Sequence, residues 1–373
     1  MSRRSMLLGD VTTIVAGQSP KGSDISDFPA KYPFHQGVRD FGRIFPTDRT
    51  YVESPPRIAD IGDVLLSVRA PIGRVNKAQK KTAIGRGLMA VRGGEYLDSN
   101  YLFYFLESLS SLWGQFESGG SVFANLGKTD LARVPIHLPP IHEQRAIAAT
   151  LGALDDKIES NRRAIDLAEN LADQLFCRQA KDVATLTDVA KLTMGSSPPG
   201  NTYNEDGEGI PFYQGVRDFG RRFPGHRVWT TGAIRLSHDD DTLVSVRAPV
   251  GELNRSRETC CIGRGVAAIT SDFPSSIYYS LRAAQAVWGP VQQEGTVFGA
   301  INKADLSKAQ ISWPYLDALS ELEGQLAGID KKIRSLSTEV ENLIALRDTL
   351  LPELLSGRIR VPEARETTQE VVA

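Results

Sequence analysis

Two stretches of the chain carry apolar residues at alternating intervals of four and three positions. A 3.5-residue repeat flanked by charged positions is typical of a coiled coil rather than of a helix lying on a sheet. The pattern therefore predicts two spacer helices, at residues 141–182 and 315–357. Their seams are Ile147, Leu151, Leu154, Ile158, Asn161, Ile165, Ala168, Ala172 and Leu175, then Leu319, Leu322, Leu326, Ile329, Ile333, Leu336, Val340, Leu343, Arg347, Leu350 and Leu354.

Single residues add detail to these two helices. Asn161 is a polar position in the first seam and fits a register-setting role. Pro352 is expected to kink or interrupt the second helix near its end, because proline cannot donate a backbone hydrogen bond. Gly357 is expected to be the C-terminal cap.

The stretches before the helices have a different pattern, in which short apolar runs are punctuated by glycine and proline. Val64–Val68 and Thr242–Val246 are typical of buried strands, and Tyr101–Leu112 is typical of a helix. We expect mixed α/β (α+β) domains at residues 1–140 and 183–314, with a C-terminal tail at residues 358–373.

The two halves of the chain repeat each other. His35–Arg43 returns as Tyr213–Arg221 with only its first residue changed, which is an offset of 213 − 35 = 178. Further along, the offset becomes 303 − 128 = 175, and subtracting 175 also superimposes the two helical seams. The chain is two copies of one unit, and antiparallel pairing of the helices would relate the copies by an approximate two-fold axis. Other repeated segments are Ser67–Gly73 with Ser245–Gly251, Ile84–Gly87 with Ile262–Gly265, Val122-Phe123 with Val297-Phe298, and Lys128–Leu131 with Lys303–Leu306.

The composition excludes several classes of protein. With 41% hydrophobic and 24% charged residues, the chain is typical of a folded protein and not of a disordered one. No apolar run reaches the roughly 18 residues of a membrane span, and the apolar stretch at the start is too short for a signal peptide. We therefore expect a cytoplasmic protein. The three cysteines and five histidines show no metal-ligand spacing and no disulfide framework.

The net charge of −2 does not by itself indicate a nucleic-acid binder, but its distribution is uneven. Residues 1–140 carry 17 Lys and Arg against 13 Asp and Glu, whereas residues 183–314 carry 13 of each. The cations of these domains are mostly arginines. Arginine suits base edges and phosphates because its planar fork donates two hydrogen bonds at once.

The motifs of the enzymes that act on nucleic acids or nucleotides are missing. No Asn-Pro-Pro-Tyr or Asp-Pro-Pro-Tyr segment could hold a flipped adenine, and no strand is followed by G-x-G-x-x-G. Gly127-Lys128-Thr129 lacks the first glycine of a phosphate loop, and the two Asp-Phe-Gly segments lack the other kinase motifs. We predict a chain that carries no catalysis of its own.

From about Leu8 to Val361 the chain resembles the specificity subunits of type I restriction–modification systems. Val134–Ala148 is similar to that family's junction into the spacer helix, and Leu350–Ile359 is similar to its C-terminal ending. The two recognition domains are closer copies here than is usual in the family. The second junction, Trp313–Ala318, lacks the Pro-Pro and Glu-Gln of the first. Further matching segments are Gly17–Pro20, Gly195–Pro198, Gly62–Ser67, Asp130-Leu131 and Leu154–Ile158.

The resemblance implies partners and excludes cofactors from this chain. Two methyltransferase subunits would bind it, each with S-adenosylmethionine, and each would methylate an adenine in double-stranded DNA. Motor–nuclease (restriction) subunits would add ATP- and Mg-dependent translocation and cleavage. Because the two domains are near-identical, we expect a bipartite site with similar halves, close to an interrupted palindrome, with the helices fixing the distance between the halves.

The repeated polar residues are the candidates for DNA contact. Glutamine pairs bidentately with adenine and arginine with guanine, which favours Gln36, Arg39 and Arg43 with Gln214, Arg217 and Arg221 as base contacts. Arg69 with Arg247, and Arg86 with Arg264, lie beside Gly and Pro and are candidates for phosphate contacts.

Several alternatives stay open at this point. Asp40 could simply clamp Arg39, with Phe41-Gly42 as a buried turn, and Lys128 and Lys303 are more typical of a structural role. Arg222 replaces Ile44 and is a candidate for a difference between the half-sites. The divergent loops 46–60 and 224–240 could equally hold the specific readout.

A second function class also fits the repeat. A coiled-coil scaffold with two peptide-binding domains would explain the helices and the duplication, although not the ordered family motifs or the repeated arginine loops. Salt-dependent binding to duplex DNA would separate the two classes, because phosphate contacts release counterions.

Overall fold

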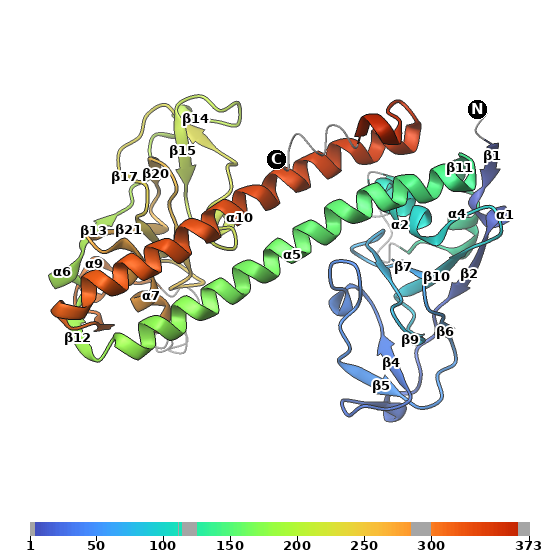
Figure 1. Ribbon diagram of the computed structural model, residues 1–373, viewed down its shortest axis with the longest axis horizontal. Helices are drawn as coiled ribbons and strands as arrows, with labels where there is room; N and C mark the ends of the chain where they lie inside the picture. Colours follow the sequence, from blue (N-terminus) through green and yellow to red (C-terminus); the bar gives the residue numbers. More distant parts are fainter. Residues whose placement is uncertain (1–3, 111, 114–124, 285–299, 365–373) are drawn as a thin grey trace. The chain divides into compact units, whose positions relative to one another are not determined.

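The computed structural model describes residues 4–110, 112–113, 125–284 and 300–364 (Figure 1). The repeated pairs Val122-Phe123 and Val297-Phe298 lie outside these residues. Packing divides the chain into two units: unit 1 runs to Ser160 and resumes at Glu339, and unit 2 is Asn161–Thr338. Each unit therefore contains one α/β domain and one part of each long helix.

The two predicted spacer helices are present as α5 (Ile141–Gln179) and α10 (Leu316–Ser356). In unit 1, the Nζ of Lys157 on α5 lies 3.0 Å from Glu339 on α10, and Asp155 bonds Arg347. Going from the first contact to the second, the residue number falls along α5 and rises along α10, so the two segments run antiparallel. In unit 2, Ile165 packs in one apolar cluster with Ile333 and Leu336. The prediction of two antiparallel helices with buried seams is confirmed.

The end of α10 differs from the expectation in one respect. The helix continues through Pro352 to Ser356, so the proline does not interrupt it. Gly357 has a φ of 77°, and its N–H donates to the carbonyl of Glu353 at 3.0 Å. It is therefore the left-handed C-terminal cap that the sequence predicts.

The domain of unit 1 holds three sheets. A two-stranded sheet has the order β1-β11, a four-stranded sheet β2-β10-β7-β8, and a five-stranded sheet β3-β5-β4-β9-β6, in which β4 and β9 are parallel. Its elements are β1 (Arg4–Leu7), α1 (Leu8–Val11), β2 (Thr12–Ala16), β3 (Ile25–Ser26), β4 (Tyr32–His35), β5 (Thr50–Val52), β6 (Ile58–Ala59), β7 (Val64–Ser67), β8 (Val75–Lys77), β9 (Thr82–Ile84), β10 (Leu88–Gly93), α2 (Ser99–Ser108), α4 (Lys128–Ala132) and β11 (Pro135–Leu138).

The domain of unit 2 repeats this plan element by element. Its sheets have the orders β12-β22, β13-β21-β18-β19 and β14-β16-β15-β20-β17, and β15 and β20 are again parallel. Its elements are β12 (Asp182–Thr185), α6 (Leu186–Val189), β13 (Lys191–Met194), β14 (Tyr203–Asn204), β15 (Ile210–Tyr213), β16 (Trp229–Thr230), β17 (Leu236–Ser237), β18 (Thr242–Ser245), β19 (Leu253–Arg255), β20 (Cys260–Ile262), β21 (Val266–Thr270), α7 (Pro274–Ala283), α9 (Lys303–Ser307) and β22 (Gln310–Trp313).

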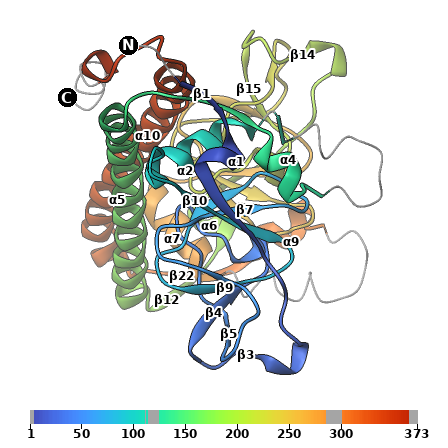
Figure 2. The same ribbon diagram turned by 90° about the vertical axis from the view of Figure 1, so that its right-hand side faces the viewer.

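The core of unit 1 joins the domain to the helices. Helix α2 lies between the four-stranded sheet and α5 (Figure 2), and its Tyr101 and Leu102 share one apolar cluster with Leu151 of α5 and Leu343 of α10. The narrow seam of α5 therefore packs against its own domain as well as against the other helix. Among the described residues, no helix is long and apolar enough to cross a membrane.

Candidate DNA interface

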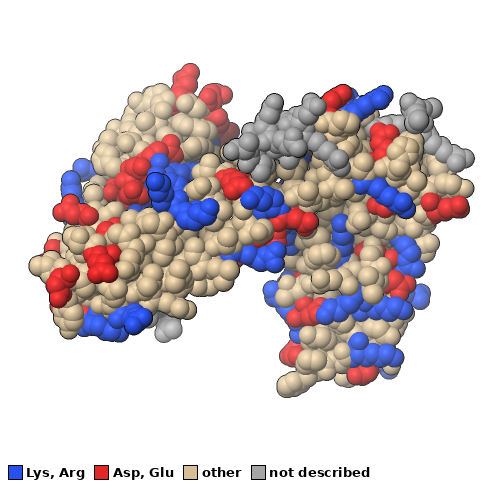
Figure 3. Space-filling model, in the orientation of Figure 1, with Lys and Arg blue, Asp and Glu red and all other residues tan. Residues whose placement is uncertain are grey.

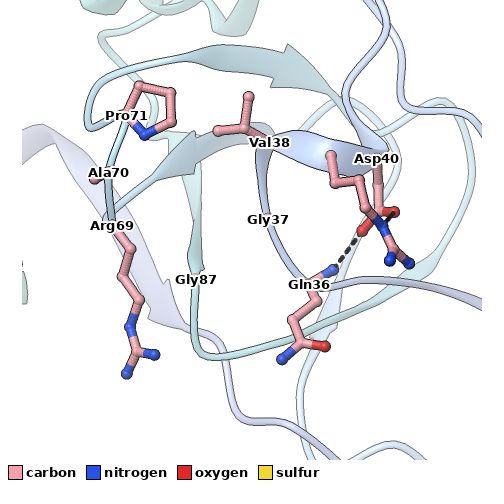
Figure 4. Close-up of a pocket in the computed structure, with 9 residues that line it drawn as sticks. Gln36, Gly37, Val38, Asp40, Arg69, Ala70, Pro71 and Gly87 are labelled. Atoms are coloured by element: carbon pink, nitrogen blue, oxygen red, sulfur yellow. Dashed lines mark hydrogen bonds and ion pairs between the residues drawn. The ribbon is translucent and has the colours of Figure 1, made fainter. Parts of the chain in front are cut away.

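Three repeated motifs meet around one cavity in unit 1. The cavity has a volume of about 580 Å³ and is lined by Gln36–Asp40, Arg69–Pro71 and Gly87 (Figure 4). The side chains of Gln36 and Arg69 extend on either side of Gly87. The first and the third motif are 87 − 36 = 51 residues apart in the sequence, and the parallel pairing of β4 with β9 brings them together.

Unit 2 has the equivalent cavity, with a volume of about 680 Å³. Most of the same positions line it: Gln214–Asp218 replaces Gln36–Asp40, and Ala248-Pro249 replaces Ala70-Pro71, whereas the counterparts of Arg69 and Gly87 do not line it. Tyr203, Phe212, Arg227 and Val228 complete its wall. The repeat thus conserves a cavity and not only a fold.

A buried carboxylate shapes each reading loop, the name used here for Gln36–Arg43 and Gln214–Arg221. Asp40 closes a 3-10 turn and accepts the backbone N–H of Gln36 at 2.8 Å, and Asp218 accepts that of Gln214 at 2.7 Å. Arg39 is 78% exposed, and its Nε lies 3.8 Å from Asp40. Asp40 therefore holds the backbone turn first and restrains the Arg39 side chain only weakly.

The repeated glycines allow close packing behind the reading loop. A Cβ on Gly87 would lie 2.3 Å from the carbonyl oxygen of Gln36, and one on Gly265 would lie at the same distance from that of Gln214. Because a side chain cannot occupy that space, the Ile-Gly-Arg-Gly motif requires glycine there. Arg86 and Arg264, between the glycines, are exposed.

Serine hydroxyls fix the turns that carry the other arginines. Ser67 Oγ donates to the carbonyl of Pro71 at 2.7 Å and accepts the N–H of Arg74 at 2.9 Å. Ser245 makes the same two bonds, to Pro249 and from Glu252. The turns present Arg69 and Arg247 to solvent, and Arg69 lines its cavity whereas Arg247 does not.

Arg43 and Arg221 lie at the other end of the reading loops and face helix α5. Arg43 forms an ion pair with the buried Asp155, and Arg221 forms one with Asp166. Neither arginine lines the two cavities described above. Their contact with DNA stays a prediction, while the structure gives both a role in tying the loop to the helix.

The prediction that Arg222 distinguishes the half-sites is wrong. Its side chain is only 2% exposed, pairs with Asp330 of α10, and stacks 3.6 Å from the ring centre of Tyr278. An arginine enclosed in this way is out of reach of DNA. The substitution of Ile44 by Arg222 therefore changes how the domain is joined to the helix.

The acidic residues that form ion pairs with these arginines were not predicted from the sequence. Asp155 accepts the hydroxyl of Tyr104 at 2.7 Å, and Asp330 accepts that of Tyr279 at 2.8 Å. Both pairs recur at the offset of 175, which is a signal that could have found them. Each aspartate joins the α2 or α7 helix of its domain to the long helix.

The charged side chains do not form one basic patch on the face shown in Figure 3, where Lys and Arg are interspersed with Asp and Glu. DNA contact would therefore depend on individual arginines placed at the cavities rather than on a general positive field. Among the described residues, no group of His, Cys, Asp and Glu side chains could hold a metal ion.

Comparison with known proteins gives a consistent result. Residues 4–170 match the family model described as type I restriction modification DNA specificity domain. The chain is 28% identical over 337 residues to a putative type I restriction enzyme MjaX specificity subunit from Methanocaldococcus jannaschii, covering 81% of this chain and 79% of that protein. It is 22% identical to the MjaIX specificity subunit of the same organism, covering 85% of this chain and 82% of that one.

A solved structure shares the fold. The crystal structure of a type I restriction–modification S subunit from M. genitalium aligns with a TM-score of 0.65 at 17% sequence identity, covering 95% of this chain and 96% of that one. At this identity the likeness supports the duplicated architecture alone.

Proposed function

We propose that the chain is a specificity subunit of a type I restriction–modification system, which recognises DNA, and that it reads a bipartite site with one cavity for each half. The observation that carries the proposal is the double occurrence of one cavity with the same glutamine, arginine and aspartate on its wall. A duplicated sequence can share a fold for stability alone. A duplicated, exposed and hydrogen-bonding cavity points to two copies of one ligand.

The roles of the side chains follow from their placement. Gln36 and Gln214 are exposed at the start of the reading loops, where the amide can pair with both edge groups of an adenine. Arg39 and Arg217 are exposed one turn further on and suit guanine. Arg69, Arg86, Arg247 and Arg264 lie on turns around the loops and suit phosphates, which position the protein without reading sequence.

Partner subunits supply the chemistry in this proposal. Two methyltransferase subunits bring S-adenosylmethionine and methylate an adenine in each half-site, and restriction subunits bring ATP-driven translocation and cleavage. This chain selects the DNA and binds none of these cofactors. The relatives support the assignment, since their names describe specificity subunits of restriction enzymes.

The test is base-resolution mapping of adenine methylation in cells that express the chain with its methyltransferase, beside cells that lack the chain. We expect a bipartite motif with similar inverted halves that disappears without the chain. Gln36→Ala should relax one half and Gln214→Ala the other, because each lies in a separate cavity.

Matched controls separate reading from general damage. Lys128 and Lys303 are also repeated and exposed but line neither cavity, so their replacement by alanine should leave the motif unchanged. Methylation that does not depend on the chain would refute the proposal. Binding of a peptide ligand without salt-dependent binding to duplex DNA would favour the scaffold instead.

A further inference from the structure

The two cavities share a frame but differ in part of their lining. Arg69 and Gly87 line only the cavity of unit 1, and the cavity of unit 2 has an additional wall. In unit 2, Tyr203 and Arg227 line the cavity, whereas their counterparts at the offset of 178, Ile25 and Arg49, do not line the cavity of unit 1. All the other repeated lining positions on the reading loop are identical. The additional wall of unit 2 is therefore one place where the two domains can differ in what they read.

Tyr203 presents a fixed aromatic ring. Its centroid lies 4.8 Å from that of Phe212, with 32° between the ring planes, and its hydroxyl donates to the carbonyl of Pro198 at 2.8 Å. Phe212 and Pro198 hold the ring in place before any ligand arrives. Ile25 occupies the same place on its strand, is half-buried, and packs into the apolar cluster of Phe34.

Arg227 differs from Arg49 in that it forms an ion pair with the aspartate of its own reading loop, Asp218. Its Nη2 and Nε lie 2.6 and 3.0 Å from Oδ1 of Asp218, which is buried. Asp218 is therefore neutralised by Arg227, and Arg217 has no ion-pair partner among the described residues. In unit 1 the reading-loop arginine, Arg39, keeps its own aspartate at 3.8 Å.

We propose that unit 2 discriminates at one base position that unit 1 leaves unread, with Tyr203 as the discriminating residue and Arg227 as the residue that holds the wall. The proposal rests on the proposed function above. A fixed ring offers an apolar contact to a base, the chemistry that favours the methyl group of thymine. The recognised site is then an interrupted palindrome that is broken at this position.

The experiment exchanges the two walls in the full chain with its methyltransferase and maps the methylated motif. Tyr203→Ile copies unit 1 and should lower discrimination at one position by about 10-fold, the typical size for one base contact. The change should appear only in the half that Gln214→Ala relaxes. Tyr203→Phe keeps the ring and loses only the bond to Pro198, so its motif should stay close to that of the natural chain.

The reciprocal variant, Ile25→Tyr, should add discrimination at the matching position of the other half. If the Tyr203→Ile variant does not methylate DNA at all, the Tyr203→Phe and Ile25→Tyr variants test the proposal in its place. A new base preference in the first half with Ile25→Tyr supports the proposal, and the absence of that preference overturns it. Unchanged halves in a methylating Tyr203→Ile variant also overturn it.

The two proposals fail in different ways. A natural motif with identical halves at every specified position refutes the role of Tyr203 but leaves the bipartite reading intact. A motif that does not depend on the chain refutes the reading itself.

Discussion

Unit 1 and unit 2 each have a side-chain contact between the same two positions, with the carboxylate at the opposite position in each unit. In unit 1, Lys80 donates to the carboxylate of Asp48 at 2.6 Å. At the same two positions, 178 residues later, unit 2 has His226 facing the carboxylate of Glu258. The carboxylate has moved from one segment to the other, and the contact between the segments remains.

The buried aspartates that join each domain to a long helix show the same principle in the interior. Asp155 and Asp330 are equivalent, and each bonds an equivalent tyrosine. The arginines that neutralise them come from different places: Arg43 and Arg347 in unit 1, and Arg222 and Arg255 in unit 2. The comparison teaches that the reading loop is kept residue by residue, while its supports are kept only as pairs of opposite charge.

The largest expected effect on stability distinguishes Asp330 from Asp155. Asp330→Ala leaves Arg222 and Arg255, only 2% and 4% exposed, with the more distant carboxylates of Glu169 at 3.7 Å and Asp240 at 3.3 Å alone. Loss of one partner of a buried pair costs about 3–5 kcal/mol. Asp155→Ala should cost less, about 1–3 kcal/mol, because Arg43 and Arg347 are 20% and 15% exposed and can turn to water.

Urea unfolding of the full chain measures the difference. Asp156→Ala, an exposed neighbour on the same helix, is the control and should be close to neutral. Equal losses for the two buried aspartates would show that the different arginine sources do not matter.

The next effect should be the same in both units. Gly87→Ala and Gly265→Ala each drive a methyl group to 2.3 Å from the carbonyl of the reading loop. We expect each to cost about 1–3 kcal/mol and to weaken methylation through its own half-site. Gly37→Ala and Gly215→Ala, whose Cβ atoms would meet nothing within 4 Å, are the stability controls. A loss in one unit alone would break the equivalence of the cavities.

A pH effect should separate the units. Burial lowers the pKa of His35 from its ordinary value of 6.5, against Asp40 and Asp48, which raise it, and with Lys80, which lowers it further. Below pH 6.5 His35 binds a proton in the unfolded chain more readily than in the folded one. The contribution of neutral His35 to the free energy of unfolding is therefore present above pH 6.5 and is lost as the pH falls below it.

In unit 2 the position is Tyr213, whose pKa is raised by burial, so it stays neutral over this range. Hydrogen exchange at pH 7.5 and 5.5 should show faster opening of β4, but not of β15, on acidification. His35→Tyr should remove the difference. Equal acid sensitivity of both strands in the natural chain would contradict this assignment.

The smallest expected effect on stability concerns the ion pair between Lys80 and Asp48. Lys80→Glu places a second carboxylate beside Asp48 and should cost about 0.5–1 kcal/mol, since Lys80 is 57% exposed and the pair is screened by salt. Adding Asp48→His copies unit 2 and should recover most of the loss. A double-mutant cycle measures the coupling, and additive losses would show that the two positions do not interact.

The sequence by itself determined the duplication, the two antiparallel helices and the repeated segments that line each cavity. These features are local or periodic: the seams follow the heptad spacing, Gly357 ends α10, and the repeated Gln36, Arg39 and Gly87 segments appear in order twice. Local patterns of this kind are set by backbone sterics and by the burial of one face, both of which are readable along the chain.

Only the tertiary structure decided which charges face solvent and which are internal. Arg39 and Arg222 look alike in the sequence, yet Arg39 is 78% exposed and Arg222 is enclosed. The reason is that burial of an arginine requires a carboxylate, and the one for Arg222 is Asp330, 108 residues away on helix α10. Arg43 likewise pairs with the buried Asp155 of helix α5. The fold, by placing such carboxylates, encloses Arg222 and leaves Arg39 and Arg69 exposed at the cavity of unit 1.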